Sequence, residues 1–429
     1  MTTMAIDNKD KKGLKSSIER EQNELACSAE REKIKGSKNL NVPPLRFPEF
    51  NGEWEKYKLS KICSFFSGGT PSSSKKEYYD GNIPFIRSGE LHEEQTELFI
   101  TEDGFKNSAT KMVEVGDLLL ALYGATSGDI AISKINGAIN QAILCIRTNQ
   151  NKKFIESIWR KHVEKLLQTY LQGGQGNLSA DIVKNISFYF SRIEEQNKLA
   201  EFISLLDERI ATQNKIIEKY ESLIKGLNDS LYKQYGNAIT TSFADLGHSY
   251  SGLSGKSAED FGSGKPFITY LNVYSNSVVN ENDYQYVRIS DGEKQNVVKY
   301  GDVLFTLSSE TPEEVGIGSI YLGKSDVYLN SFCFGIHITD TKVAFPPYLS
   351  YYVSSTPFRK FIYPYAQGST RFNLCKADFE KARIKIPSLE NQKRIYFILS
   401  HIASKVKTET KLLDLFRLQK QSLLRQMFI

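Results

Sequence analysis

The sequence has few of the residues that build disulfide frameworks and metal centres. Its 429 residues include five cysteines and five histidines. No two cysteines have the C-x-x-C spacing of zinc ribbons and redox motifs, and no two histidines stand four residues apart on one helix face. We therefore expect no metal site built from these residues and free thiols at Cys27, Cys63, Cys145, Cys333 and Cys375.

Long hydrophobic runs are also absent. No segment approaches the roughly 18 consecutive apolar residues of a membrane span, and the opening MTTMAIDNKDKK lacks the apolar core of a signal peptide. The net charge of +5 is modest for this length, so it permits nucleic-acid binding without requiring it. The sequence predicts a cytoplasmic protein that contacts no membrane, with enough apolar residues for two or three folded domains.

Motifs of catalysis are incomplete. Residues 255–257 (GKS) imitate the end of a phosphate-binding loop, but Tyr250 occupies the place of the required earlier glycine. Residues 345–348 (FPPY) are similar to the Pro-Pro-aromatic motif of adenine methyltransferases, where a residue that hydrogen-bonds the target amino group stands in place of Phe345. A glycine-rich S-adenosylmethionine loop, a nuclease-like set of carboxylates and lysine, and a Ser/His/Asp set are not recognisable. We expect a chain that has no catalytic centre and binds no cofactor itself.

What the sequence does contain is an internal duplication. Short matches recur in the same order roughly 182 to 196 residues apart, which is the length of a domain. Residues 83–86 (IPFI) return as 265–268 (KPFI), 113–119 (VEVGDLL) as 298–304 (VKYGDVL), and 193–198 (IEEQNK) as 389–394 (LENQKR). The chain therefore consists of two related halves, each of which ends in a long segment of helical character.

The two closing segments have the apolar spacing of a coiled coil, three and four residues in alternation. Polar residues interrupt both patterns at the same place, Gln213 and Glu409. An acidic excess in residues 194–235 faces a basic excess in residues 389–429, which favours antiparallel pairing; the alternative is that each helix lies on its own domain. The predicted seam consists of Ile203, Leu206, Ile210, Ile217, Tyr220, Ile224, Leu227, Leu231, Leu399, Ile402, Val406, Leu413, Phe416, Leu423 and Met427.

These patterns predict a mixed α/β fold with two similar globular domains, separated by two long helices that pair as an antiparallel coiled coil. The expected segments are a flexible charged tail (1–41), a first domain (42–192), a central helix (193–236), a second domain (237–388) and a C-terminal helix (389–429).

Loops rich in Ser, Thr, Gly, Tyr, Gln, Lys and Arg recur at equivalent places in both halves, and these residue types contact phosphates and base edges. Each loop alone could be a plain surface turn, but the recurrence favours DNA binding. In the first half the candidates are Ser67, Gly68, Gly69, Thr70, Ser72, Lys75, Lys76, Tyr78, Tyr79, Arg87, Tyr123, Thr126, Ser127, Gln172, Gln175 and Asn177. In the second half they are Ser251, Ser254, Lys256, Ser257, Tyr270, Asn272, Ser308, Ser309, Gln367, Ser369, Thr370, Arg371 and Asn373.

From Asn41 to Ile429 the sequence resembles the specificity subunit of type I restriction-modification systems. The residues that carry the resemblance are 42–50 (VPPLRFPEF) with Glu53-Trp54, 67–72 (SGGTPS), the Val-Gly-Asp-Leu-Leu turn, Asn140-Gln141, and the entry through Glu195-Gln196 into a long helix. The second half departs from the family pattern at residues 251–255 (SGLSG), where the Gly-Gly-Thr-Pro run is absent.

The resemblance implies that the globular halves are target-recognition domains, each reading one half of a bipartite double-stranded DNA site, and that the helices fix the spacer between the half-sites. It also implies partners: two methyltransferase subunits and helicase-nuclease subunits, which bring S-adenosylmethionine, ATP and magnesium. Two other functions stay open at this point: a fused methyltransferase or nuclease with unrecognised motifs, and a coiled-coil scaffold without a DNA function.

Overall fold

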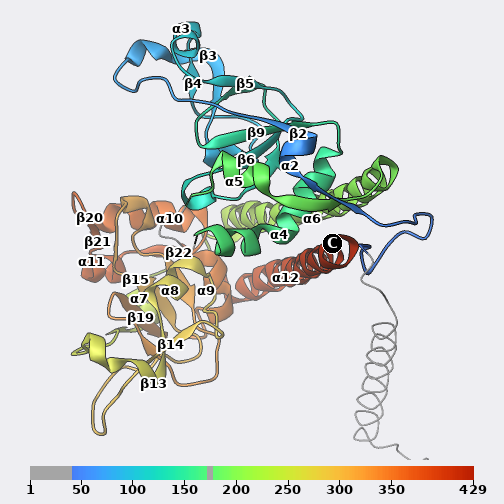
Figure 1. Cartoon of the computed structure of the whole chain (residues 1–429). Coiled ribbons are helices and arrows are strands. Elements are labelled where there is room, and N and C mark those ends of the chain that lie inside the picture. The colour runs from blue at the N-terminus through green and yellow to red at the C-terminus, as the bar shows by residue number, and fades with distance from the viewer. Residues whose placement is uncertain (1–40, 172–176) are drawn as a thin grey trace, which may run out of the picture. The chain divides into compact units, whose positions relative to one another are not determined.

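In the computed structural model, which describes residues 41–171 and 177–429, the chain divides into two compact units. Unit 1 contains the residues up to Ile210 together with Leu415–Ile429, and unit 2 contains Ala211–Asp414. Each unit therefore includes one globular half of the sequence and one part of each long helix, α6 (Ile193–Tyr235) and α12 (Leu389–Met427), green and red in Figure 1. The predicted mixed α/β class is confirmed, and the long helices begin where the sequence placed them.

The globular half of unit 1 begins and ends with a strand. Its strands are β1 (Glu55–Lys58), β2 (Cys63–Ser67), β3 (Tyr79–Ile86), β4 (Phe99–Ile100), β5 (Lys111–Val113), β6 (Leu118–Ala121), β7 (Ile130–Ile132), β8 (Gly137–Ile139), β9 (Ile143–Thr148) and β10 (Ser187–Phe190). Its helices are α2 (Leu59–Ile62), α3 (Glu102–Lys106), α4 (Lys152–Leu171) and α5 (Ala180–Asn185), with short 3₁₀ turns η1 (Lys76–Tyr78), η2 (Ser88–Glu90) and η3 (Gly124–Thr126).

The globular half of unit 2 repeats much of this order and adds short elements before its last strand. Its strands are β11 (Ile239–Thr241), β12 (Gly247–Ser251), β13 (Phe261–Ile268), β14 (Tyr284–Val287), β15 (Val303–Thr306), β16 (Ser308–Ser309), β17 (Gly318–Ile320), β18 (Tyr328–Leu329), β19 (Cys333–Ile338), β20 (Ala366–Gln367), β21 (Phe372–Leu374) and β22 (Ile384–Ile386). Its helices are α7 (Phe243–Leu246), α8 (Tyr270–Ser275), α9 (Pro346–Tyr352), α10 (Thr356–Ile362) and α11 (Lys376–Lys381), with η4 (Ala258–Asp260), η5 (Pro312–Glu314) and η6 (Tyr363–Tyr365).

The main sheets of the two units have the same topology, whereas the small sheet β16-β21-β20 of unit 2 has no counterpart in the described residues of unit 1. The antiparallel order β2-β9-β6-β7 in unit 1 corresponds to β12-β19-β15-β17 in unit 2. A second sheet places β3 parallel to β8, as β13 is parallel to β18. The pair β1-β10, just before α6, corresponds to β11-β22, just before α12. The duplication seen in the sequence is therefore a duplication of the fold.

Strand β6 is buried on both faces along its whole length, which explains its uniformly apolar residues. In β6, Leu118 and Leu120 join the core that contains Trp54 and Trp159, while Leu119 faces a second cluster. The equivalent strand β15 divides its residues between two cores in the same alternating way.

The two long helices pair antiparallel. Within unit 1, Lys420 contacts Asp207, and the Arg209 guanidinium lies 4.2 Å from the Phe416 ring centre. Within unit 2, Gln213 Nε2 donates to Glu409 Oε2 at 2.5 Å. Residue numbers rise along α6 as they fall along α12, as antiparallel helices require. Every predicted seam residue is buried or half-buried.

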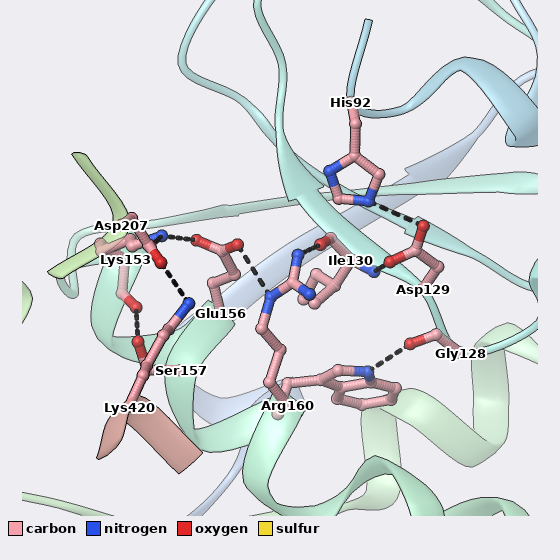
Figure 2. A network of polar contacts seen from close by, with 11 residues as sticks. His92, Gly128, Asp129, Ile130, Lys153, Glu156, Ser157, Arg160, Asp207 and Lys420 are labelled. Atoms are coloured by element: carbon pink, nitrogen blue, oxygen red, sulfur yellow. Dashed lines mark hydrogen bonds and ion pairs between the residues drawn. The ribbon is translucent and has the colours of Figure 1, made fainter. Parts of the chain in front are cut away.

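The helices pack on the globular halves as well as on each other, so the alternative of two unpaired helices, each on its own domain, is wrong. In unit 1, Ile203 of α6 and Phe428, just past the end of α12, lie in the core around Trp54. In unit 2, Leu399 of α12 and the half-buried Leu227 of α6 pack on the equivalent core. Lys153 of α4 lies 2.7 Å from Glu156 and 2.8 Å from Asp207, and Figure 2 shows this ion-pair chain continuing to Lys420.

The repeated Gln at the start of each long helix has a common structural role. Gln196 Nε2 donates to Ser191 O at 2.8 Å, and its Oε1 accepts the Asn151 N–H. The fully buried Gln392 makes the same two bonds, to Pro387 O and from Phe345 N–H, each within 2.8 Å. These glutamines attach the helix starts to the globular halves.

In the described residues, no helix is long and apolar enough to span a membrane. Cys63, Cys145, Cys333 and Cys375 are free thiols, and burial raises the pKa of Cys145 to about 12. Cys27, the predicted tail up to residue 40, and the candidate contacts Gln172 and Gln175 lie outside the described residues.

Candidate nucleic-acid interface

The candidate loops of unit 1 meet at one edge of the central sheet. Because β9 is antiparallel to both β2 and β6, its first residues lie opposite the last residues of those strands: Leu144 faces Ser67, and Ile143 faces Ala121. The loops that follow β2 and β6 therefore leave the sheet together. Thr70 Oγ1 donates to the Gln141 side chain, which joins the first loop to the turn before β9.

Two further segments reach this edge. The Leu178 amide donates to Leu122 O at 2.9 Å, which places Asn177 beside the loop after β6. The Asn140 amide donates to Ile86 O at 3.3 Å, which places Arg87 beside the start of β9. We call the surface formed by the loops after β2 and β6, the turn before β9, Arg87 and Asn177 loop edge 1.

Unit 2 builds the same edge from its own loops. The Leu374 amide donates to Leu307 O at 2.8 Å, and the Asn330 amide donates to Ile268 O at 3.0 Å. Ser308 pairs with Asn373, and the Tyr270 hydroxyl donates to Ser308 O at 2.8 Å. The first two contacts are the counterparts of those in unit 1, whereas the last two are specific to unit 2, and we call the surface loop edge 2.

Most of the predicted side chains at these edges are accessible. The exposed candidates are Ser67, Thr70, Ser72, Lys75, Lys76, Tyr123, Asn177, Ser251, Ser254, Ser257, Gln367, Ser369, Thr370, Arg371 and Asn373. The half-buried ones are Gly68, Tyr79, Arg87, Thr126, Ser127, Lys256 and Tyr270, and the buried ones are Gly69, Tyr78, Asn272, Ser308 and Ser309.

The prediction that Asn272 lies on an accessible surface is wrong. Asn272 is fully buried, and its side-chain amide donates to the carbonyls of Asn280 and Asp283 at 2.9 and 3.0 Å. Its Oδ1 accepts the Asn280 N–H at 2.9 Å. Asn272 therefore holds the segment after α8, because a buried amide must satisfy its own hydrogen bonds.

Two predicted cations are neutralised by carboxylates. Lys256 Nζ, with a side chain 8% exposed, lies 2.6 Å from Glu293, and its hydrogen bond is the main cause that lowers the pKa of Glu293 to about 2. Arg87 lies 2.9 Å from Glu90 and 2.8 Å from Glu97. Partial desolvation acts to raise the pKa of Glu90, but hydrogen bonds from Arg87 outweigh it and lower that pKa to about 2.

The accessible positive charge differs between the edges. In loop edge 1 it comes from Lys75 and Lys76; Lys75 Nζ lies 2.9 Å from the Tyr78 hydroxyl and 4.8 Å from its ring centre. In loop edge 2 it comes from Arg371, which is exposed and forms no ion pair with a described residue. Exposed cations of this kind can bind phosphates or guanine edges.

The second half lacks the Gly-Gly-Thr-Pro run but keeps the close backbone contact of its first glycine. A Cβ on Gly68 would stand 1.7 Å from Ile139 O, and one on Gly252 would stand 2.0 Å from Asn330 O. Both positions therefore require glycine, because the end of β2 or β12 passes directly over a neighbouring backbone. The first glycine of the motif has this role in both units, whereas a Cβ on the second glycine, Gly69, would stand 2.7 Å from Ala109 Cβ in unit 1.

Other residues at the edges were missed by the sequence prediction. Gln141 contacts Thr70, and Phe332 is 58% exposed at the turn before β19. The signal was the recurrence of Asn140 as Asn330: each side chain accepts an amide N–H two residues on, from Ala142 at 3.1 Å and from Phe332 at 2.9 Å.

The motifs that imitate catalytic sequences have structural roles. Both prolines of residues 345–348 lie buried in the first turn of α9, where proline is favoured. Lys256 of the GKS triplet is held by Glu293. Within residues 41–171 and 177–429, no three His, Cys, Asp or Glu side chains are placed to hold a metal ion.

Residues 51–222 and 244–415 each match the model of a family described as the type I restriction modification DNA specificity domain. The chain belongs to this family. The two matches correspond to the two halves of the duplication, each with its loop edge. Assignment to the family thus rests on most of the chain rather than on a single motif.

Curated relatives are similar over about half of their length. The MjaVIII specificity subunit of Methanocaldococcus jannaschii is 24% identical over 193 residues, 44% of this chain and 43% of the relative. The EcoR124I/EcoR124II specificity subunit of Escherichia coli is 25% identical over 206 residues, 46% of this chain and 50% of the relative. Both are named as specificity subunits of type I restriction enzymes.

Solved structures support the fold over a longer range. A chain from a structure of the type I R-M system covers 90% of this chain and 99% of its own length, with a TM-score of 0.57 and 16% identity. The S subunit from M. genitalium gives the same coverage, with a TM-score of 0.51 and 14% identity. At these identities the likeness concerns the fold.

Proposed function

We propose that this chain is the DNA-recognition subunit of a type I restriction-modification enzyme, and that loop edges 1 and 2 each read one half of a bipartite, asymmetric site in double-stranded DNA. The observation that carries the proposal is the assembly, in both units, of the same set of separate loops at the same edge of the same sheet. Equivalent edges with different side chains suit two readers of different sequences, since base contacts specify while phosphate contacts position.

Reading the target in two places gives high selectivity from modest contacts. A mismatched base pair costs about 1 to 3 kcal/mol, so several pairs at each of two edges provide strong discrimination. The paired helices α6 and α12 would fix the number of unread base pairs between the half-sites. The domain limits 42–192 and 237–388 remain our proposal for the two recognition domains.

The long helices also offer a surface for protein partners. Leu205, Leu415 and Leu418 of unit 1 are each about 60% exposed, although they lie on helices whose seam residues are covered. In unit 2, Phe397 and Leu223 are 64% and 50% exposed. Large apolar side chains left exposed along a helix are available to pack against a partner. We propose that two methyltransferase subunits dock here, and that helicase-nuclease subunits complete the restriction complex.

In this proposal the chain itself methylates and cleaves nothing and binds no cofactor. S-adenosylmethionine, ATP and magnesium would act through the partner subunits, in the cytoplasm. Methyl transfer or cleavage by homogeneous chain without partners would contradict this part of the proposal.

The experiment is methylation mapping of DNA from a host strain with and without this chain. We expect a bipartite methylated motif that disappears when the chain is absent. Exchange of residues 42–192 for the corresponding domain of a relative should then change one half of the motif and preserve the other. A simultaneous change of both halves would refute the assignment of one reader to each unit.

The spacer role has its own test. Insertion of one heptad after Lys215 lengthens α6 by about 10.5 Å and keeps the seam in register. Because DNA rises about 3.4 Å per base pair, the insertion corresponds to roughly three base pairs. We expect a longer spacer or loss of binding, with the bases of each half-site unchanged. An unchanged spacer at full activity would show that the helices do not set the distance.

A further inference from the structure

The loop after β6 is held at its base by a tryptophan of α4. The Trp159 indole Nε1 donates to Gly128 O at 2.8 Å, and Gly128 lies between the loop residues 123–127 and β7. Trp159 is fully buried. The neighbouring Arg160 donates to Ile130 O at 2.6 Å, and Figure 2 shows the carbonyls of Gly128 and Ile130 on the side of the hairpin that faces α4.

In unit 2 an arginine of α10 makes the equivalent bond. Arg359 Nη1 donates to Gly316 O at 2.7 Å, and its Nη2 donates to the carbonyls of Glu313 and Val315, each at 2.7 Å. Gly316 stands just before β17, as Gly128 stands just before β7. These three bonds of Arg359 all go to backbone oxygens, and burial lowers its pKa.

Both glycines have a left-handed backbone conformation and lie directly against the helix. Their φ angles are +87° and +62°, a region that other residues rarely adopt. A Cβ on Gly128 would stand 2.9 Å from Val163, and one on Gly316 would stand 2.4 Å from Ile362. The loop base thus touches the helix directly, and one helix side chain satisfies its carbonyl.

We infer that Trp159 and Arg359 are positioning residues for base recognition, each setting the conformation of one loop in its own unit and thereby the specificity of one half-site. The inference rests on the proposed function. Two side chains of unrelated chemistry make the same bond to the same carbonyl, which indicates that both units need the carbonyl fixed rather than a particular residue. Base contacts depend on hydrogen-bond geometry, so a loop that moves relaxes specificity even when its own residues are intact.

The first test compares two tryptophans in one core. Trp159→Phe removes the N–H that bonds Gly128 and keeps an aromatic ring. Trp54→Phe is the matched control, because the Trp54 indole Nε1 is buried without a hydrogen-bond partner among the described residues. With the variants assembled with their methyltransferase partner, we expect Trp159→Phe to lower discrimination at one half-site about 10-fold, within the range of a lost base contact. We expect Trp54→Phe to leave both half-sites unchanged.

The second test applies to unit 2. Arg359→Met removes the three bonds, Arg359→Lys restores part of them, and Lys360→Met is the control, since Lys360 is exposed on the same helix. We expect Arg359→Met to relax the other half-site, with partial rescue by Arg359→Lys. Hydrogen exchange of loop residues 123–128 and 310–316 provides a readout that needs no DNA, and protection should fall only in the loop of the altered unit.

The outcomes separate this inference from the proposed function. If the unaltered complex methylates no bipartite motif, the proposed function fails, whatever the variants do. If it methylates one and the variants lose affinity for all DNA equally while both half-site preferences stay unchanged, Trp159 and Arg359 are structural only and the inference is overturned. Relaxation of the same half-site by variants in both units would overturn it as well.

Discussion

Units 1 and 2 stabilise one fold with different side chains, as the turn before the central strand shows. Asp117 and Asp302 accept an amide N–H from three residues earlier, at 3.1 and 2.8 Å. Asp117 is paired with Arg147, whose guanidinium lies 5.1 Å from the Phe66 ring centre.

In unit 2 the same carboxylate has other partners. Asp302 lies 2.8 Å from His337 Nδ1 and accepts a hydrogen bond from the Tyr250 hydroxyl at 2.6 Å, and the Tyr250 and His337 rings stack at 4.3 Å. The comparison teaches that the turn needs a buried carboxylate and that the carboxylate needs donors, whereas the identity of those donors is open. The units can therefore diverge in sequence while the loop edges keep their positions.

The largest expected difference between the units concerns the apolar residue that the end of a long helix places against each core. Phe428 is fully buried beside Trp54 and Phe154, with ring centres 6.3 and 5.2 Å away. Phe428→Ala should destabilise unit 1 by about 3 to 5 kcal/mol, since it removes a large side chain from a packed core. Leu231, at the end of α6 in unit 2, is only half-buried, so Leu231→Ala should cost less. Hydrogen exchange resolved by unit is the measurement, and equal losses would refute the asymmetry.

The second effect concerns the carboxylate of the turn. Desolvation acts to raise the pKa of Asp117, but the hydrogen bond from Arg147 and the amide of Glu114 outweigh it and lower that pKa. Because the folded pKa lies below the unfolded value of about 3.9, Asp117 stabilises unit 1 above that value, and the contribution is lost as pH falls through the folded pKa. Asp117→Asn should cost about 2 kcal/mol at neutral pH, a typical value for bonds to a charged group, and nearly nothing in strong acid.

Thermal unfolding of Asp117→Asn and the unaltered chain from pH 7 to pH 2 is the measurement. Glu114→Gln serves as the control, because Glu114 contributes its backbone amide to this turn and its side chain is exposed. A loss of stability that is constant over this pH range would contradict the role assigned to the charge.

Local patterns in the sequence predicted much of this fold. The expected helix 193–236 is Ile193–Tyr235, because apolar periodicity and the Glu-Gln start are local signals. The duplication predicted equivalent loops, and the sheet brings those loops together. The partners of individual loop side chains left no such signal: Lys256 pairs with Glu293, 37 positions away, and Asn272 binds the backbone of Asn280, eight positions away. A loop side chain of a type that contacts DNA can thus be bonded within its own domain instead.

The packing of the end of α12 on the core of the first half could not be predicted from the sequence either. The apolar residues of α12 near Met427 fit the seam pattern, and periodicity alone does not show that the following Phe428 enters the core of the first half. Such a contact joins residues almost the whole chain apart, and only the three-dimensional arrangement reveals it.

A smaller effect concerns the shared polar position of the two helices. Gln213 and Glu409 are buried against each other in unit 2, where polar seam residues specify register at a cost in stability. The double variant Gln213→Leu with Glu409→Leu should raise the stability of unit 2, because two apolar side chains replace a polar pair in the seam. Glu409→Leu alone should lower it, because the Gln213 amide loses one of its two acceptors and Lys405 loses its ion-pair partner. Thermal unfolding of the three variants tests this, and a destabilised double variant would show that the pair is required for pairing itself.

The smallest effect sharpens the comparison between the loop edges. Lys76 in loop edge 1 and Arg371 in loop edge 2 are both exposed, and neither forms an ion pair with a described residue. Lysine is a point charge that suits a phosphate, whereas the fork of arginine can also bind a guanine edge in two places. Lys76→Ala should weaken binding to all DNA sequences alike and flatten the salt dependence by about one phosphate contact. Arg371→Ala should instead relax one position of a half-site, and Arg371→Lys should recover affinity without recovering that preference. Titrations of the assembled complex at several salt concentrations, on the target and on its single-base variants, distinguish the two roles; if both alanine variants act alike on every sequence, Arg371 binds phosphate and loop edge 2 reads its bases through other residues.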